Sequence, residues 1–210
     1  MHSGAPVRIL ALGDSYTIGE GVLPAERWPV QLAKQLRAVG WEAAEPVIVA
    51  RTGWTTDDLA GGIAAAEPDG PFDLVTLLIG VNNQFRGREL SEYRVQFREL
   101  LQRAIAFAGE RPGRVLVLSI PDWGATPFGS FRGREAQQHT AAQIDAFNQA
   151  NRAVCQAAGA RYVDITSITR QGSGGAGWLA ADGLHPSGRM YGAWVEQVLP
   201  VALSAISAAS

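Results

Sequence analysis

Short apolar runs and longer amphipathic stretches alternate along the whole chain. The short runs are rich in Val, Ile and Leu, and they predict five strands, at residues 7–12, 46–50, 73–79, 114–120 and 161–165. Several of these runs are apolar on successive positions; residues 74–79, for example, read Leu-Val-Thr-Leu-Leu-Ile. A strand without polar alternation is typical of a sheet that is buried on both faces.

The longer stretches repeat apolar residues at three- and four-residue spacing, which indicates helices that each bury one face. Five helices are predicted, at residues 28–39, 56–66, 91–108, 141–158 and 190–205. Thr55 and Asp58 form the pattern of a capping box at the start of the second helix. Strands that alternate with helices in this way predict an α/β protein built on a parallel sheet.

Two segments show neither pattern, at residues 121–139 and 171–186. Both are longer than most connections in α/β proteins, and long loops often carry function. In an open parallel sheet, ligands bind beyond the carboxyl ends of the strands. The residues that follow each predicted strand are therefore the candidates for chemistry.

Reactive side chains occur at these positions. Ser15 comes soon after the first predicted strand, Gly53 after the second and Asn82 after the third. Asp182 and His185 lie in the second irregular segment, past the fifth strand. We expect one edge of the sheet to collect a hydroxyl, backbone amides, a carboxamide, a carboxylate and an imidazole, which are the components of an acyl-transfer site.

A serine hydroxyl attacks an ester only when a base removes its proton, and histidine suits that task near neutral pH. We therefore assign Ser15 as the nucleophile, His185 as the base and Asp182 as the carboxylate that orients the imidazole. The Ser15 and Gly53 amides and the Asn82 side chain are candidate donors to an oxyanion hole. Simpler roles stay open, because Ser15 also suits a helix cap and Gly53 and Asn82 also suit turns.

Four short motifs in this order resemble the conserved blocks of the SGNH-hydrolase superfamily, the GDSL-type esterases and lipases. They are Gly13-Asp14-Ser15, Gly53, Gly80-Val81-Asn82 and Asp182-Gly183-Leu184-His185. The resemblance spans nearly the whole chain and implies a flavodoxin-like three-layer αβα fold, with a five-stranded parallel sheet in the order 2-1-3-4-5. It also implies that Ser15, Gly53 and Asn82 form the oxyanion hole and that Asp182 and His185 complete a catalytic triad. Asn83 departs from the family, which commonly has Asp at this position.

Composition and charge narrow the class of protein. The chain has 210 residues, 47% of them hydrophobic, and a formal net charge of −2, which suits a single globular domain over residues 1–210. Its arginines are scattered, so no basic stripe indicates nucleic-acid binding. Cys155 is the only cysteine, which excludes a disulfide framework and a thiol metal cluster.

Targeting and membrane segments are not predicted. The first residues lack the pattern of a signal peptide, so we expect a cytoplasmic protein unless a precursor has been trimmed. Residues 190–209 carry little charge but contain Glu196 and Pro200, and they read as a terminal helix without membrane insertion. We expect a monomer or a small homo-oligomer.

The predicted substrate is a small-molecule ester, split without a metal or other cofactor. Five aromatic residues fall near the site and belong either to an apolar pocket or to the core: Trp54, Phe85, Trp123, Phe128 and Trp178. A chain of this length leaves little material for a lid over a lipid groove, which favours short-chain acyl or acetyl esters. Three alternatives stay open: a lysophospholipase or thioesterase, a catalytically silent module that binds an acylated ligand, and a nucleotide binder of flavodoxin type.

Overall fold

A five-stranded parallel sheet forms the centre of the molecule. The computed structural model describes residues 5–172 and 174–208. The strands are β1 (Ile9–Gly13), β2 (Val47–Ala50), β3 (Leu74–Leu78), β4 (Val115–Leu118) and β5 (Arg161–Val163). Their order is β2-β1-β3-β4-β5, and every neighbouring pair is parallel. The fold class, the strand order and the position of each strand agree with the sequence-based prediction.

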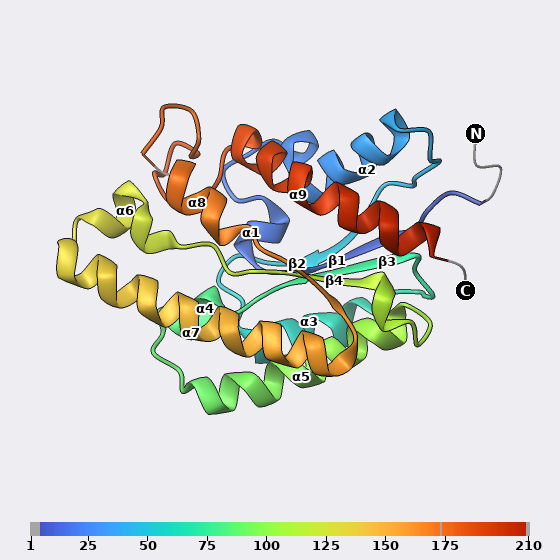
Figure 1. The fold of residues 1–210 in the computed structure, drawn as a ribbon, viewed down its shortest axis with the longest axis horizontal. Helices are drawn as coiled ribbons and strands as arrows, with labels where there is room; N and C mark the ends of the chain where they lie inside the picture. The colour runs from blue at the N-terminus through green and yellow to red at the C-terminus, as the bar shows by residue number, and fades with distance from the viewer. Residues whose placement is uncertain (1–4, 173, 209–210) are drawn as a thin grey trace.

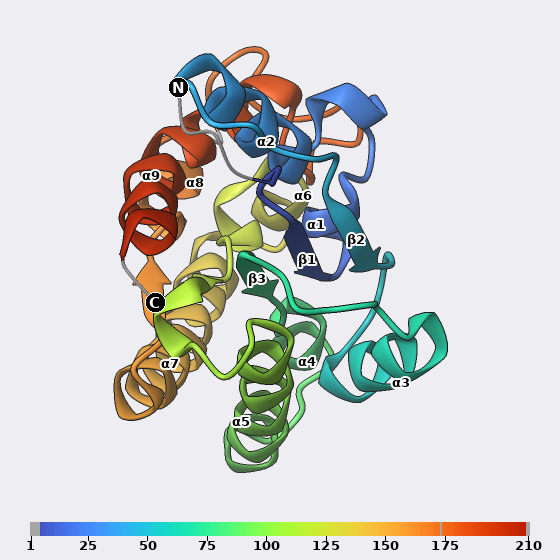
Figure 2. The same ribbon diagram turned by 90° about the vertical axis from the view of Figure 1, so that its right-hand side faces the viewer.

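Helices cover both faces of the sheet and complete three layers (Figures 1 and 2). One layer contains α2 (Trp28–Ala38), α8 (Thr166–Gly172) and α9 (Gly188–Ser207), and the other contains α3 (Thr56–Ala66), α5 (Leu90–Phe107) and α7 (Arg134–Ala158). Short helices lie in the connections: α1 (Ser15–Ile18), α4 (Val81–Phe85), α6 (Pro127–Ser130) and the 3₁₀ turns η1 (Pro24–Glu26), η2 (Pro112–Arg114) and η3 (Trp123–Ala125).

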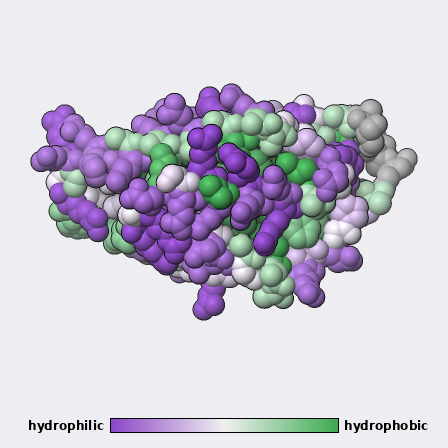
Figure 3. Space-filling view, turned by 90° about the horizontal axis from the view of Figure 1, so that it is seen from below, coloured by the Kyte–Doolittle hydropathy of each residue, from purple (hydrophilic) through white to green (hydrophobic). Residues whose placement is uncertain are grey.

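The core occupies both spaces between the sheet and its helices. Every residue of β1, β3 and β4 is buried, which explains why their sequences are apolar without alternation. Trp28 of α2 and Trp194 of α9 are fully buried on one side of the sheet, and Tyr93 and Phe97 of α5 on the other. The outer face of the α5 and α7 layer, which points away from the sheet, is largely hydrophilic (Figure 3), as expected for amphipathic helices.

The helix boundaries agree only in part with those predicted from the apolar pattern of the sequence. The capping box is present, because the Thr55 N–H donates to Asp58 Oδ2 at 3.0 Å. The prediction for 121–139 is corrected, since this segment contains η3, α6 and the first turns of α7. Helix α7 begins at Arg134, whereas the apolar pattern predicted a start at residue 141. The pattern missed this start because the first turn lies at the α6 end of the molecule and buries little apolar surface (Figure 1).

The terminal helix packs on the body of the molecule. Helix α9 lies beside α2 and against the sheet, and its buried positions include Tyr191, Trp194 and Val198. Across the described ranges, no helix is both long enough and apolar enough to cross a bilayer.

Candidate active site

Ser15 lies at the tight turn between β1 and α1. Asp14 caps this helix, with its Oδ1 accepting the Tyr16 N–H at 3.0 Å. Gly13 is needed here because a Cβ at that position would lie 2.6 Å from the Leu78 carbonyl oxygen. As the first residue of α1, Ser15 has no carbonyl within the helix to which its own N–H can donate, so this amide is available to a ligand.

The loop before α9 brings Asp182 and His185 to Ser15. His185 Nε2 lies 3.0 Å from Ser15 Oγ, and His185 Nδ1 lies 2.6 Å from Asp182 Oδ2. Asp182 Oδ1 also accepts the backbone N–H groups of Leu184 and His185, each at 2.9 Å. The carboxylate thus favours a proton on Nδ1, which leaves Nε2 as the acceptor that faces the serine hydroxyl.

The same hydrogen bonds keep Asp182 ionised. Partial burial would raise its pKa, but the bonds from the His185 ring and from two backbone amides outweigh burial and hold the pKa below its usual value. Asp182 is therefore a carboxylate throughout the neutral range.

Gly53 and Asn82 lie beside Ser15 on the wall of one cavity. Gly53 adopts a positive φ of 84°, and its carbonyl accepts a 2.7 Å hydrogen bond from Arg86 Nη2. Asn82 Nδ2 donates to the Trp54 carbonyl at 2.9 Å, which fixes the carboxamide and leaves its second N–H for a ligand. Three residues with potential N–H donors, Ser15, Gly53 and Asn82, thus line the same cavity.

Asn83 has a different position from Asn82, although the two are adjacent. Its side chain is fully buried, its Oδ1 accepts the Thr56 N–H at 3.1 Å, and its Nδ2 donates to Thr56 Oγ1 at 2.7 Å. Asn83 therefore ties the start of α3 to the β3–α4 turn and does not line the cavity. These bonds give the local role of Asn83, at a position where the family commonly has Asp.

The cavity in front of Ser15 has a volume of about 270 Å³ and mostly apolar walls. Three of the five aromatic residues singled out from the sequence line it, namely Phe85, Trp123 and Phe128. The Trp123 ring contacts the other two, with ring centres 5.2 Å and 6.2 Å away. The remaining lining is Ser15, Tyr16, Thr52, Gly53, Val81, Asn82, Leu184 and His185.

The other two aromatic residues lie outside this lining, which corrects the pocket prediction. The Trp54 ring packs on Gly62 of α3, where any side chain would overlap it. The Trp178 ring packs on Gly172 and Gly175, with the Arg189 guanidinium 4.8 Å from its centre. Both rings pack on glycine residues outside the cavity, and their closeness to the site in the sequence did not predict this packing.

Four lining residues were not identified from the sequence: Tyr16, Thr52, Val81 and Leu184. Each is a direct sequence neighbour of a candidate site residue, and this closeness was the one sequence feature that could have identified them as lining residues. Tyr16 is buried, and its ring centre lies 5.4 Å from that of His185, which limits the movement of the imidazole.

A buried carboxylate next to the nucleophile was also missed. Asp14 is fully buried, and desolvation raises its pKa to about 7 despite the hydrogen bond from the Tyr16 amide. Its Oδ2 has no hydrogen-bond partner among the described residues. Asp14 thus shapes the turn with a buried carboxyl group whose charged form is poorly compensated.

Other parts of the described structure offer less chemistry. A larger groove of about 440 Å³ lies between α7 and α8, and its Arg170 is paired with Asp122 and Asp145. Cys155 is buried in α7, and burial raises its pKa to about 12, so it is not a nucleophile at neutral pH. Among the described residues, no three His, Cys, Asp or Glu side chains cluster as metal ligands would.

Comparisons with known proteins find one matching family and several similar structures. The model of the GDSL-like Lipase/Acylhydrolase family matches residues 11–193 of the chain. No curated protein matches the sequence significantly.

Several solved structures have the same fold. TesA is 22% identical, with a TM-score of 0.72 over 94% of this chain and 99% of TesA. Phospholipase A1 from Streptomyces albidoflavus NA297 is 20% identical, with a TM-score of 0.68 over 95% of this chain and 99% of that one. The psychrotrophic esterase EstA from Pseudoalteromonas sp. is 16% identical, with a TM-score of 0.67 over 94% and 97% of the two chains.

Proposed function

Since the chain belongs to the GDSL-like lipase/acylhydrolase family, we propose that it is a serine esterase that forms an acyl-enzyme on Ser15. The observation that carries this proposal is the continuous hydrogen-bonded series from Asp182 through His185 to Ser15, at 2.6 Å and 3.0 Å. The series ends at an apolar cavity of a size that suits a small organic group.

In the first half of the reaction, His185 Nε2 accepts the Ser15 proton while Oγ attacks the ester carbonyl carbon. The carbonyl oxygen becomes an oxyanion, which the Ser15 and Gly53 amides and Asn82 Nδ2 stabilise. The tetrahedral intermediate then collapses, and the protonated His185 gives its proton to the departing alkoxide. An acyl ester on Ser15 and a free alcohol remain.

In the second half, water takes the place of the alcohol. His185 removes a proton from water as it attacks the acyl carbon, and it returns that proton to Ser15 Oγ when the acid leaves. Asp182 stays ionised throughout, so it stabilises the imidazolium of both halves without accepting the proton.

The cavity favours short acyl groups. Its volume of about 270 Å³ lies just below the usual range for ligand pockets, and Trp123 and Phe128 contribute to its walls. We infer a preference for acyl chains of about two to six carbons over longer ones.

A series of p-nitrophenyl esters of increasing chain length tests this proposal. We expect kcat/KM to be highest for the short esters and to fall for chains beyond about eight carbons, which exceed the cavity. Activity that kept rising toward long chains would contradict the proposed acyl preference and favour a lysophospholipase or thioesterase. Failure to release p-nitrophenol from any ester would contradict the esterase function itself.

A further inference from the structure

Charged side chains around the mouth of the cavity differ in how they are compensated. Arg86 donates to the Gly53 carbonyl and lies 3.8 Å from Asp58, and Arg88 lies 2.6 Å from an Asp57 oxygen. These two guanidinium groups are therefore already paired with acceptors of the protein.

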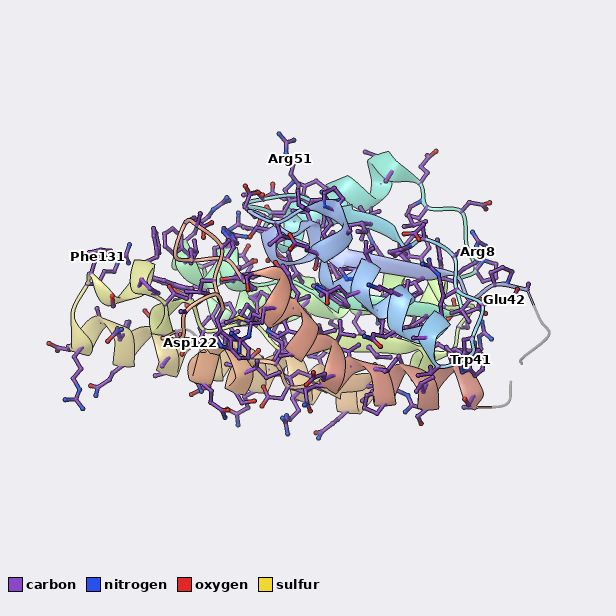
Figure 4. All side chains as sticks on the ribbon, turned by 90° about the horizontal axis from the view of Figure 1, so that it is seen from above. Arg8, Trp41, Glu42, Arg51, Asp122 and Phe131 are labelled. Carbon is purple, nitrogen blue, oxygen red and sulfur yellow. The ribbon has the colours of Figure 1, made fainter. Side chains whose placement is uncertain are left out.

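Arg132 is held in a different way. Its guanidinium carbon lies 5.3 Å from the centre of the Trp123 ring and 5.6 Å from the centre of the Phe85 ring, and both rings line the cavity. The Arg132 backbone N–H donates to the Gly129 carbonyl, which anchors the chain between α6 and α7. This segment lies at the end of the molecule where Figure 4 labels the neighbouring Phe131.

No carboxylate compensates this charge within the described ranges, where Arg132 forms no ion pair within 4 Å. Two aromatic faces hold the planar guanidinium by cation–π attraction, which needs none of its N–H groups. The N–H groups at its edge are thus free to donate two parallel hydrogen bonds to a carboxylate or phosphate.

A negatively charged side chain also lies next to one of the lining residues. Thr52, a lining residue, is hydrogen-bonded to the side chain of Glu20, which is exposed. A negative group on a ligand is repelled by Glu20 and attracted by Arg132 beside the Trp123 and Phe85 rings.

We propose that Arg132 is a specificity-determining residue that favours esters carrying a carboxylate or phosphate near the scissile bond. The inference rests on the proposed esterase function and adds a substrate class to it. The anionic group belongs either to the acyl part or to the alcohol part of the ester, since both chemistries present the same acceptor to the guanidinium.

Two pairs of substrates distinguish these sources. Mono-p-nitrophenyl adipate and p-nitrophenyl hexanoate differ by an anionic group at the end of the acyl chain. The pair 4-acetoxybenzoate and 4-acetoxybenzamide differs by a charge on the alcohol part at nearly constant shape. The quantity to measure is the ratio of kcat/KM for the anionic ester to kcat/KM for its neutral partner.

Arg132→Met removes the charge and keeps most of the length of the side chain. We expect it to lower the ratio about three- to tenfold for at least one pair. Arg132→Lys should retain part of the preference, and about 0.5 M NaCl should weaken that of the wild type. Arg134→Met is the matched control, since Arg134 is exposed and its loss removes the same charge two residues away, and it should leave both ratios unchanged.

The outcomes separate this inference from the proposed function. Ratios that stay at the wild-type value in Arg132→Met, or that fall equally in Arg134→Met, would overturn the role of Arg132 and leave the esterase intact. A wild-type enzyme that hydrolyses none of the four esters would overturn both.

Discussion

Asn82→Ala should remove one of three donors from the oxyanion hole and leave the fold intact. The Asn82 side chain donates one hydrogen bond of 2.9 Å to the Trp54 carbonyl, so its loss costs about 1 kcal/mol of stability. In the transition state, the loss is larger, because a fixed donor in a water-poor site stabilises the developing charge by about 2.7–4 kcal/mol. We therefore expect kcat to fall roughly 10²–10³-fold with a much smaller change in KM.

Asn83→Ala should have the reverse balance of effects. Its removal leaves the buried Thr56 N–H without its 3.1 Å partner, which costs about 1–3 kcal/mol of folding free energy. Since Asn83 does not line the cavity, kcat should fall less than about tenfold. Asn83→Asp keeps an acceptor for the Thr56 N–H but cannot donate to Thr56 Oγ1, so we expect near-normal kcat and a small loss of stability.

The assay combines kinetics with unfolding. The three variants are compared on one short-chain p-nitrophenyl ester for kcat and KM, and their urea or thermal unfolding gives the change in stability. A folded Asn83→Ala enzyme that loses more kcat than Asn82→Ala would refute the assignment of Asn82 as the oxyanion donor.

Three further predictions concern pH, packing and metals. Burial raises the pKa of Asp14 from 3.8 to about 7, so the protonated carboxyl is favoured in the folded state. The stability that this preference contributes is full below pH 3.8 and is lost as pH rises to about 7. Asp14→Asn should remove this decline, which we expect to amount to about 3 kcal/mol between pH 5 and 8 in urea unfolding. Gly80→Ala should destabilise the protein by at least about 2 kcal/mol in thermal unfolding, because Gly80 has a φ of 128° and a Cβ there would displace the buried Tyr93 hydroxyl; an unchanged Tm would show that the turn adapts. A chelator should leave the rate unchanged, and a chelator-sensitive esterase would require a metal that the mechanism does not use.

The sheet was predictable from the sequence because its central strands are buried on both faces. Short runs that are apolar on successive positions, such as the one in β3, are typical of buried strands, and the long helices show a clear apolar period. Helices α1, α4, α6 and α8 were not predicted because each has at most seven residues, too few to show a period. The first turn of α7 was missed for a related reason, since it is exposed and polar.

The candidate site was predictable to the extent that topology determined it. Ser15, Gly53 and Asn82 each follow a strand, so a parallel sheet brings them to one edge. The positions of Trp54 and Trp178 were not predictable, because they depend on which surface a large ring covers in three dimensions. The unpaired state of Arg132 was hidden for the same reason, since only the structure shows which arginines find a carboxylate.

The most direct test of the proposed function is covalent labelling of Ser15. A fluorophosphonate reacts with an activated serine, so the wild-type protein should gain the mass of one adduct, and peptide mapping should place it on Ser15. Ser15→Ala, with an unchanged Tm, should take up no label and retain esterase turnover near background. A label on another residue, or a Ser15→Ala enzyme that keeps roughly a tenth or more of the wild-type kcat, would contradict the central claim that Ser15 is the nucleophile.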